Sequence, residues 1–222
     1  NINNADESIF GGKSHLATNI ERTTIIGFGN QAVNVVDGLI GGNQNIVSNF
    51  VNNSIVYGEN IQLNAGSAGP GKLKNNAVFG NIHDMTIETN SIVAGKGQTV
   101  VDGSQNAIFG ETHNINTLTN TFTQGKSNVL HTIQNSGVIG DTNDVSNNVV
   151  NSMIVGKENK GGVSENTVVF GYKNNTQQDK NVLVSGNSNT TTSNNASSVM
   201  GRLNIVTDCS DSFIMGANHN VF

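Results

Sequence analysis

The stretch Asn151-Ser-Met-Ile-Val-Gly156 decides the fold, because close copies of it recur along the whole chain of 222 residues. In most copies two or three β-branched or large apolar residues run directly into a glycine, as in Thr167-Val-Val-Phe-Gly171. Most of these glycines are about 15 residues apart, which predicts stacked copies of one supersecondary unit. The predicted repeat glycines are Gly11, Gly27, Gly41, Gly58, Gly80, Gly95, Gly110, Gly125, Gly140, Gly156, Gly171, Gly186, Gly201 and Gly216.

The residues before each glycine indicate a strand that is buried on both faces. Ile or Val stands two positions before most of the glycines, which is typical of strands and not of helices. The next position is also mostly large and apolar, and adjacent strand residues point to opposite faces. One face must line the core of the chain, and the other needs a cover. The predicted residues of this core or interface strand are Val78, Val93, Ile108, Val138, Ile154, Val169, Val184, Val199 and Ile214.

A second apolar position often follows five residues after the glycine, as at Leu130 and Val145, and predicts another short strand. Each repeat then holds two strands and two tight turns that are rich in Gly, Asn, Ser and Thr. The fold class is therefore all-β, a parallel β-solenoid of about fourteen coils with a repeat of 14–16 residues.

A polar column stands three residues after the glycines and predicts side chains that hydrogen-bond from coil to coil. Its expected role is structural, because amides can satisfy the buried polar backbone of the turns. For the histidines of the column, binding of an anion or a metal is the alternative. The column consists of Ser14, Asn30, Gln44, His83, Gln98, His113, Asn128, Asn143, Asn159, Asn174, Asn189, Asn204 and His219.

The unbroken repeat predicts a single domain over 1–222, which we interpret as a fragment of a longer protein. One interval is longer than the others, since 22 residues separate Gly58 from Gly80. The insertion at 64–76 contains glycines, Pro70 and two lysines, which predict a protruding loop and not a strand. Insertions in repeat proteins often mark a binding edge, although a solvated spacer fits this composition equally well.

Composition argues against several function classes. The net charge is -5 and the basic residues are scattered singly, so we expect neither nucleic-acid binding nor direct contact with a membrane surface. No apolar run is long enough to cross a bilayer. Cys209 is the only cysteine, which excludes a disulfide framework, and we interpret it as an inert small residue. No catalytic or metal-binding motif is present, so we predict no enzymatic activity, no cofactor and no metal site.

Candidate ligand-binding residues are those that protrude or that place an apolar side chain where the turns are otherwise polar. Such features provide contact area for a partner. Three lie in the insertion, two follow repeat glycines and one lies in an early loop. They are Lys72, Leu73, Lys74, Phe28, Tyr172 and Phe50. For each aromatic residue taken singly, packing against a neighbouring turn is the alternative.

The repeat of Asn, Ser or Thr, then apolar residues, then Gly resembles the YadA-like head repeat of trimeric autotransporter adhesins. The resemblance extends from Ser8-Ile-Phe-Gly11 to Ser212-Phe-Ile-Met-Gly216. It implies a left-handed parallel β-roll that forms a homotrimer, in which the other copies cover the second apolar face. It also implies a location on the cell surface of a Gram-negative bacterium, with the outer-membrane anchor elsewhere. The implied partner is a host cell-surface glycoprotein, such as a CEACAM receptor, or collagen, fibronectin or laminin.

Two other functions stay open. In a phage tail fibre or spike, the same roll would be a structural segment between other modules. A left-handed hexapeptide acyltransferase is also a trimeric solenoid, but six-residue steps give it about eighteen residues in each coil, and this repeat is shorter. We therefore predict a non-enzymatic adhesin head.

Overall fold

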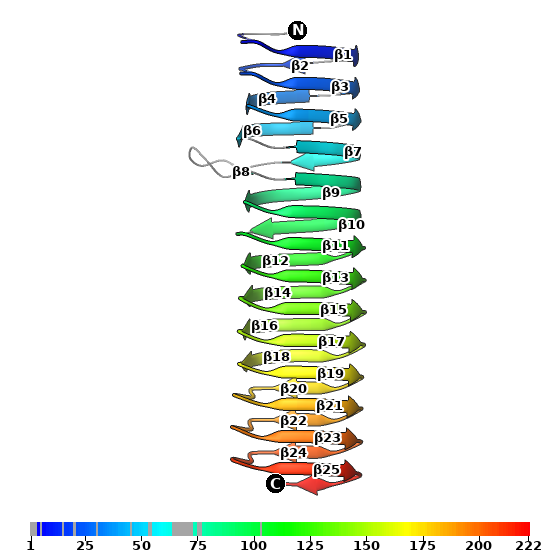
Figure 1. The fold of residues 1–222 in the computed structure, drawn as a ribbon, viewed down its shortest axis with the longest axis vertical. Coiled ribbons are helices and arrows are strands. Elements are labelled where there is room, and N and C mark those ends of the chain that lie inside the picture. Colours follow the sequence, from blue (N-terminus) through cyan, green and yellow to red (C-terminus); the bar gives the residue numbers. More distant parts are fainter. Residues whose placement is uncertain are drawn as a thin grey trace. The chain divides into compact units, whose positions relative to one another are not determined.

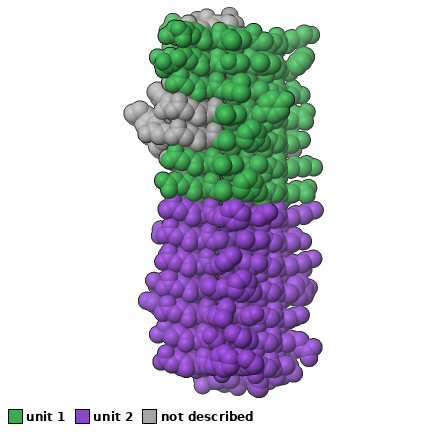
Figure 2. Space-filling view, viewed as in Figure 1, with its two compact units in different colours: residues 1–117 green, residues 118–222 purple. Residues whose placement is uncertain are grey.

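The computed structural model describes residues 4, 6–14, 16–19, 21–29, 31–44, 46–52, 55–63, 73–74, 77–102 and 104–222. Two compact units divide the chain at residues 117 and 118, and Figure 2 colours them separately. The described residues form strands and turns and contain no helix, so the all-β class is confirmed (Figure 1). Each unit is a parallel β-solenoid with a repeat of about 15 residues. That 1–222 is a single domain stays a prediction.

In unit 1, residues 1–117, the strands with the repeat glycines pair in parallel with those of the next coil. These strands are β1 (Ile9–Lys13), β3 (Thr24–Phe28), β5 (Leu39–Asn43), β7 (Ile55–Leu63), β9 (Ala77–Thr89), β10 (Ile92–Asp102) and β11 (Ala107–Glu111). The other side of the coils is formed by the C-terminal parts of β7, β9 and β10 together with separate strands. These are β2 (Leu16–Ala17), β4 (Gln31–Val36), β6 (Ile46–Asn52), β8 (Leu73–Lys74) and β12 (Asn114–Thr119), and the last of these includes the division between the units.

Unit 2, residues 118–222, repeats the same arrangement with shorter strands. The glycine-bearing strands are β13 (Phe122–Lys126), β15 (Gly137–Asp141), β17 (Met153–Lys157), β19 (Val168–Tyr172), β21 (Leu183–Asn187), β23 (Ser198–Arg202) and β25 (Phe213–Ala217). The opposite strands are β14 (Val129–Gln134), β16 (Asp144–Val150), β18 (Lys160–Glu165), β20 (Asn175–Gln177), β22 (Thr190–Thr192), β24 (Ile205–Thr207) and β26 (Asn220–Val221). Equivalent residues stand in register, so that Ile154 pairs with Val169 and Gly156 with Gly171.

The side chain two positions before the repeat glycine points into the core. All the residues predicted for the core or interface strand are at most 2% exposed, except Ile214 at 8%. The second apolar position lies opposite them, and Ile115, Leu130 and Val145 are fully buried there. Cys209 is also buried, in one cluster with Ile214. The core therefore lies between the two strands of each coil, and the second apolar face predicted for the first strand points outward.

Two of the predicted repeat glycines, Gly11 and Gly41, are wrong by one residue. The register pairs Gly12 with Gly27, and Gly27 with Gly42. A Cβ atom on Gly12 would lie 2.1 Å from the carbonyl oxygen of Gly27, and φ at Gly12 is 109°, so only glycine fits. In the Gly11-Gly12 and Gly41-Gly42 pairs, the second glycine meets this requirement.

The corrected register moves several predicted residues to other positions. Ser14 and Gln44, predicted in the polar column, are exposed turn residues with φ of 64° and 56°. Ile9 and Leu39 are exposed, and Ile40 occupies the core in place of Leu39. Each coil keeps one core residue and one turn glycine. The predicted intervals of the first quarter are irregular because they use Gly11 and Gly41 in place of Gly12 and Gly42.

The insertion is shorter than predicted. Leu73 and Lys74 form β8, which pairs in parallel with Val51–Asn52 of β6 and Glu88–Thr89 of β9. The chain returns to the sheet at Leu73. Without β8, backbone groups of the neighbouring strands β6 and β9 would lack hydrogen-bond partners. The predicted protrusion of residues 64–72 and 75–76 lies outside the described residues.

Candidate binding surfaces

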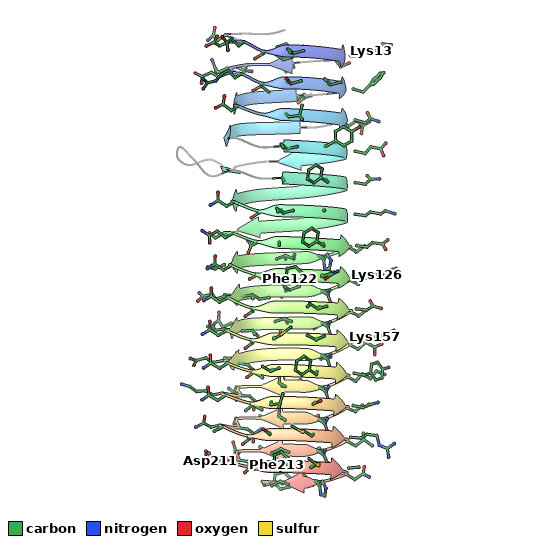
Figure 3. The ribbon with its side chains drawn as sticks, in the orientation of Figure 1. Lys13, Phe122, Lys126, Lys157, Asp211 and Phe213 are labelled. Atoms are coloured by element: carbon green, nitrogen blue, oxygen red, sulfur yellow. The ribbon has the colours of Figure 1, made fainter. Side chains whose placement is uncertain are left out.

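The outward side of the glycine-bearing strands carries an apolar stripe, which we define as the residues one and three positions before the repeat glycine. Large apolar side chains of the stripe are exposed or half-buried in both units. In unit 1 they are Ile9, Ile26, Leu39, Ile55, Tyr57, Phe79, Ile92 and Phe109. In unit 2 they are Phe122, Ile139, Met153, Val155, Val168, Phe170, Leu183, Met200, Phe213 and Met215. Phe122 and Phe213 lie between the two edges of the coils in Figure 3.

Glycines within the apolar stripe lie beneath large side chains of the next coil. A Cβ atom on Gly41 would be 2.7 Å from Cδ2 of Tyr57, so the tyrosine ring occupies the place of a missing side chain. Ile26 covers Gly11 in the same way, and its Cγ1 lies 3.9 Å from the Cβ position. In unit 2, Met153 covers Gly137 at the same distance of 3.9 Å. At Gly41 the ring of Tyr57 thus fills the space of the missing side chain, whereas at Gly11 and Gly137 a Cβ atom would fit at an ordinary contact distance.

Side-chain sizes also compensate within single coils of the apolar stripe. Ala77 accompanies Phe79 in β9, and Ser198 accompanies Met200 in β23. In β21 the order is reversed, since Leu183 precedes Ser185. Alternation of large and small side chains lets facing layers interdigitate, which is a feature of packed surfaces.

The predicted amide ladder is confirmed in unit 2, where it is a buried structural element and not a binding surface. Asn174 donates from its backbone N to Oδ1 of Asn159 at 3.0 Å. Its Nδ2 donates to the same Oδ1 at 3.2 Å and to the carbonyl oxygen of Gly186 at 2.9 Å. Fully buried members of the ladder are Asn128, Asn143, Asn159, Asn174, Asn189 and Asn204. The ladder satisfies both amide groups and turn backbone, as predicted from its position.

His113 occupies the ladder position in unit 1. It is buried, and its Nε2 lies 3.2 Å from the carbonyl oxygen of Phe109. In unit 2, His219 is exposed, and its backbone N donates to Oδ1 of Asn204 at 3.0 Å. The side chain of His83 lies outside the described residues. Within the part of the chain that the structure describes, no three His, Cys, Asp or Glu side chains gather as a metal site would require.

A second column of polar residues in unit 2 contains a buried carboxylate. Asp179 is only 2% exposed. Its Oδ1 accepts from N and Nδ2 of Asn194 at 2.9 and 3.1 Å, and its Oδ2 accepts from the hydroxyl of Thr191. Burial raises the pKa of Asp179 above its ordinary value, although these hydrogen bonds lower it in part. Asn194 takes the place of Asp179 in the next coil. Where Oδ2 of Asp179 accepts a hydrogen bond, Nδ2 of Asn194 donates one, to the carbonyl oxygen of Val206 at 3.0 Å.

Asp179→Asn is expected to stabilise unit 2 at neutral pH. The raised pKa means that the folded chain keeps the proton of Asp179 to higher pH than the unfolded chain, so its contribution to stability falls as pH rises through the two pKa values. We expect a melting temperature roughly 2–4 °C higher at pH 7, as about 1 kcal/mol gives in a chain of this length. The gain should shrink towards pH 3, where both states are protonated. Circular dichroism melts at both pH values measure it, with exposed Asp208→Asn as the control, and a lower melting temperature at pH 7 would contradict it.

The predicted ligand-binding residues belong to both units. Phe28 is 56% exposed in unit 1, with the Nζ of Lys13 5.8 Å from its ring centroid. Tyr172 is half-buried in unit 2, with the Nζ of Lys173 4.9 Å from its ring centroid. The prediction that Phe50 lies in a loop is wrong, because the residue belongs to strand β6. Leu73 and Lys74 form β8, and the side chains of all three residues are outside the described residues, as is all of Lys72.

A groove in unit 1 brings Phe28 together with two aromatic residues of the apolar stripe. Tyr57 and Phe79 are 62% and 42% exposed. The groove has a volume of about 550 Å³ and is lined by Phe28, Gly42, Asn43, Tyr57, Gly58, Glu59, Phe79, Gly80 and Asn81. Of these three aromatic residues the sequence indicates only Phe28 as a binding residue, because Tyr57 and Phe79 fit the strand pattern. Tyr57 and Phe79 are 22 residues apart because the insertion lies between them. This spacing does not indicate that they are neighbours in adjacent coils.

The residues directly after the glycines form a charged edge in unit 2. Lys126 and Lys157 project from this edge in Figure 3, and Asp211 lies at the opposite edge. The Nζ of Lys157 is 3.9 Å from Oδ2 of Asp141, and the Nζ of Lys173 is 3.4 Å from Oε2 of Glu158. Exposed pairs of this kind contribute little to stability. They keep the edge solvated and place no nucleophile beside a base.

No model of a protein family matches the chain, and no curated protein matches it. Among solved structures, UDP-N-acetylglucosamine O-acyltransferase from Moraxella catarrhalis RH4 is similar over 97% of this chain and 69% of its own, with 14% sequence identity and a TM-score of 0.15. This likeness is too low to carry an argument about fold or function. The described residues include no helix with the length and apolar character to cross a membrane.

Proposed function

We propose that the chain is a head segment of a trimeric adhesin on the surface of a Gram-negative bacterium. The observation that carries the proposal is the apolar stripe, because each unit exposes a second apolar face although its own core is already filled. Contiguous exposed apolar surface of this kind marks a site of association. The ring of Tyr57 fills the space over Gly41, and filled gaps of this kind let a face fit closely against another surface.

The best occupant of the apolar stripe is the same stripe on other copies of the chain. Identical copies related by rotation match in length and repeat, and a closed ring leaves no copy with an uncovered face. Three copies, each a left-handed roll, are the number implied by the resemblance to trimeric autotransporter heads. The turn edges and the opposite strands stay on the outside, where a host glycoprotein or a matrix protein such as collagen, fibronectin or laminin is bound.

A binding role is favoured over a catalytic one by how the polar side chains are used. The buried amides of unit 2 are engaged in the ladder, and the buried carboxylate of Asp179 accepts hydrogen bonds on both oxygens. The repeat of about 15 residues also differs from the eighteen or so of a hexapeptide solenoid. A tail-fibre segment would share the fold and the assembly and would differ in having no host ligand.

The assembly is tested by placing a charge on the apolar stripe. Phe170→Glu should weaken association at least about a hundredfold, because a carboxylate buried in the interface without a partner costs several kcal/mol. Sedimentation velocity over a range of concentrations should show a trimer for the parent chain and a monomer for the variant. Val163→Glu is the matched control, since Val163 is also exposed but lies on β18, away from the stripe. A parent chain that is monomeric at micromolar concentration would contradict the proposal.

Adhesion is tested with beads that carry the chain. We expect them to bind epithelial cells or surfaces coated with collagen, fibronectin or laminin, whereas beads that carry the Phe170→Glu variant should bind less because fewer sites act together. Deletion of residues 65–72 leaves β8 in place, and the adhesion of this variant measures whether the insertion contributes to binding. A trimer that binds none of these surfaces would favour the tail-fibre alternative.

A further inference from the structure

The groove beside Phe28 exists because of the repeat glycines. Gly42, Gly58 and Gly80 have φ of 114°, 154° and 131°, and a Cβ atom on Gly42 would lie 1.8 Å from the carbonyl oxygen of Gly58. The column of repeat glycines therefore has no side chains on its surface. It runs between the residues that precede the glycines and the residues that follow them. This column forms the floor of the groove, and backbone atoms are accessible there.

Aromatic rings stand on both sides of this floor. Tyr57 and Phe79 rise from the residues before the glycines, and Phe28 rises from the residues after them. The ring of Tyr57 lies over Gly41, which has no side chain to displace it, and still exposes more than half of its surface. Exposed rings of this size are unfavourable in water unless they serve contact with a partner.

Polar groups lie between and beside the rings. Nδ2 of Asn43 donates to Oε1 of Glu59 at 3.4 Å, so an amide and a carboxylate stand next to each other on the groove wall. Oδ1 of Asn81 is a buried acceptor to which the described residues donate no hydrogen bond. The lining contains one carboxylate and no cationic side chain. The groove thus offers ring faces and the hydrogen-bonding groups of Asn43 and Glu59, and the carboxylate of Glu59 is the one charge in its lining.

We propose that this groove binds a neutral sugar residue. The C–H faces of a pyranose ring fit flat aromatic faces, since the π-face is negative and the C–H hydrogens are weakly positive. Neighbouring hydroxyls of a sugar can donate to Glu59 and accept from Asn43. A volume of about 550 Å³ accommodates one or two sugar residues, and small-molecule sites of this size combine apolar walls with a few polar groups.

This inference deepens the proposed function, because it gives the head a glycan as its target. Tyr57 and Phe79 belong to the apolar stripe that the proposed assembly covers, so in the assembly the open side of the groove is the one formed by Phe28, Asn43 and Glu59, on the other side of the glycines. Variants of Phe28 and Glu59 therefore change the groove without changing the residues proposed for association.

The test uses the full chain on an array of immobilised oligosaccharides that end in galactose, N-acetylglucosamine, mannose or sialic acid. We expect binding to at least one neutral terminus and weaker binding to the matching sialylated one. Phe28→Ala and Glu59→Gln should each weaken that binding at least about tenfold. Glu111→Gln is the matched control and should bind like the parent, since Glu111 also follows a repeat glycine but lies outside the groove.

The inference is overturned if no neutral oligosaccharide binds, or if Phe28→Ala binds as well as the parent chain while its circular dichroism spectrum is unchanged. Sedimentation of the same samples separates this result from the fate of the proposed assembly. A trimer without sugar binding contradicts only the groove. A monomer that binds sugar in a Glu59-dependent way contradicts only the trimer.

Discussion

Ile154→Asp is expected to unfold unit 2. The side chain of Ile154 is 2% exposed and lies in the middle of the core between Val138 and Val169 of the neighbouring coils. A carboxylate there has no cationic partner and is taken out of water, which costs about 3–5 kcal/mol. Because each coil packs only on its neighbours, the defect interrupts the array at its centre. We expect the variant to lose most of its far-ultraviolet strand signal, or to melt at least 10 °C below the parent.

The control for Ile154→Asp is Asn187→Asp, which adds the same charge at an exposed position. We expect the control to melt within about 2 °C of the parent, since exposed substitutions change stability little. Ile154→Val removes one methylene without a charge and should cost only about 1 kcal/mol. If Ile154→Asp melted like either of these, the assignment of this position to the core would be wrong.

Gly156→Ala is expected to cost on the order of 3 kcal/mol or more, although it adds a single carbon atom. The backbone φ of Gly156 is 130°, which is closed to residues with a side chain. The added Cβ atom would lie 1.9 Å from the carbonyl oxygen of Gly171 and 3.0 Å from Nδ2 of Asn159. It would therefore push two coils apart and disturb the amide ladder. Chemical denaturation followed by circular dichroism measures the loss.

The same substitution at Gly162 is the control for Gly156→Ala. Gly162 lies in β18, its φ is not in the region reserved for glycine, and an added Cβ atom would meet Cγ of Gln177 at an ordinary 3.5 Å. We expect Gly162→Ala to be neutral or slightly stabilising, because alanine restricts the unfolded chain. Equal losses at both glycines would show that the loss at Gly156 does not arise from its backbone conformation.

The strand class, the parallel stacking and the core were predictable because they depend on local rules repeated many times. Ile154 and Val169 occupy the predicted core, and Asn159 and Asn174 form the predicted ladder. The exact register was less predictable where two glycines adjoin. The choice between Gly11 and Gly12 depends on which backbone meets the next coil closely, and that contact is invisible until the coils are stacked.

The candidate sites were harder to predict because they depend on which coils are neighbours. Phe28, Tyr57 and Phe79 are separated along the chain by up to 51 residues, yet they line one groove. The sequence indicated Phe28 as a binding residue because it breaks the polar pattern of the turns. Tyr57 matches the apolar pattern of the strands, so the sequence did not indicate it as a binding residue. Likewise, two apolar positions in one strand predicted that two faces are apolar but could not tell which one is the core.

The amide ladder of unit 2 also has an electrical consequence. Oδ1 of Asn128 accepts from Asn143, and each later Oδ1 in turn accepts from the following coil, as far as Asn204 and His219. The side-chain carbonyl dipoles therefore point in one direction and add, as peptide dipoles do in an α-helix, and each bond polarises the next. The row of side-chain carbonyls thus has its positive end at Asn128 and its negative end at Asn204, although the Nδ2–H groups that donate to the glycine carbonyls of the following coil oppose it in part.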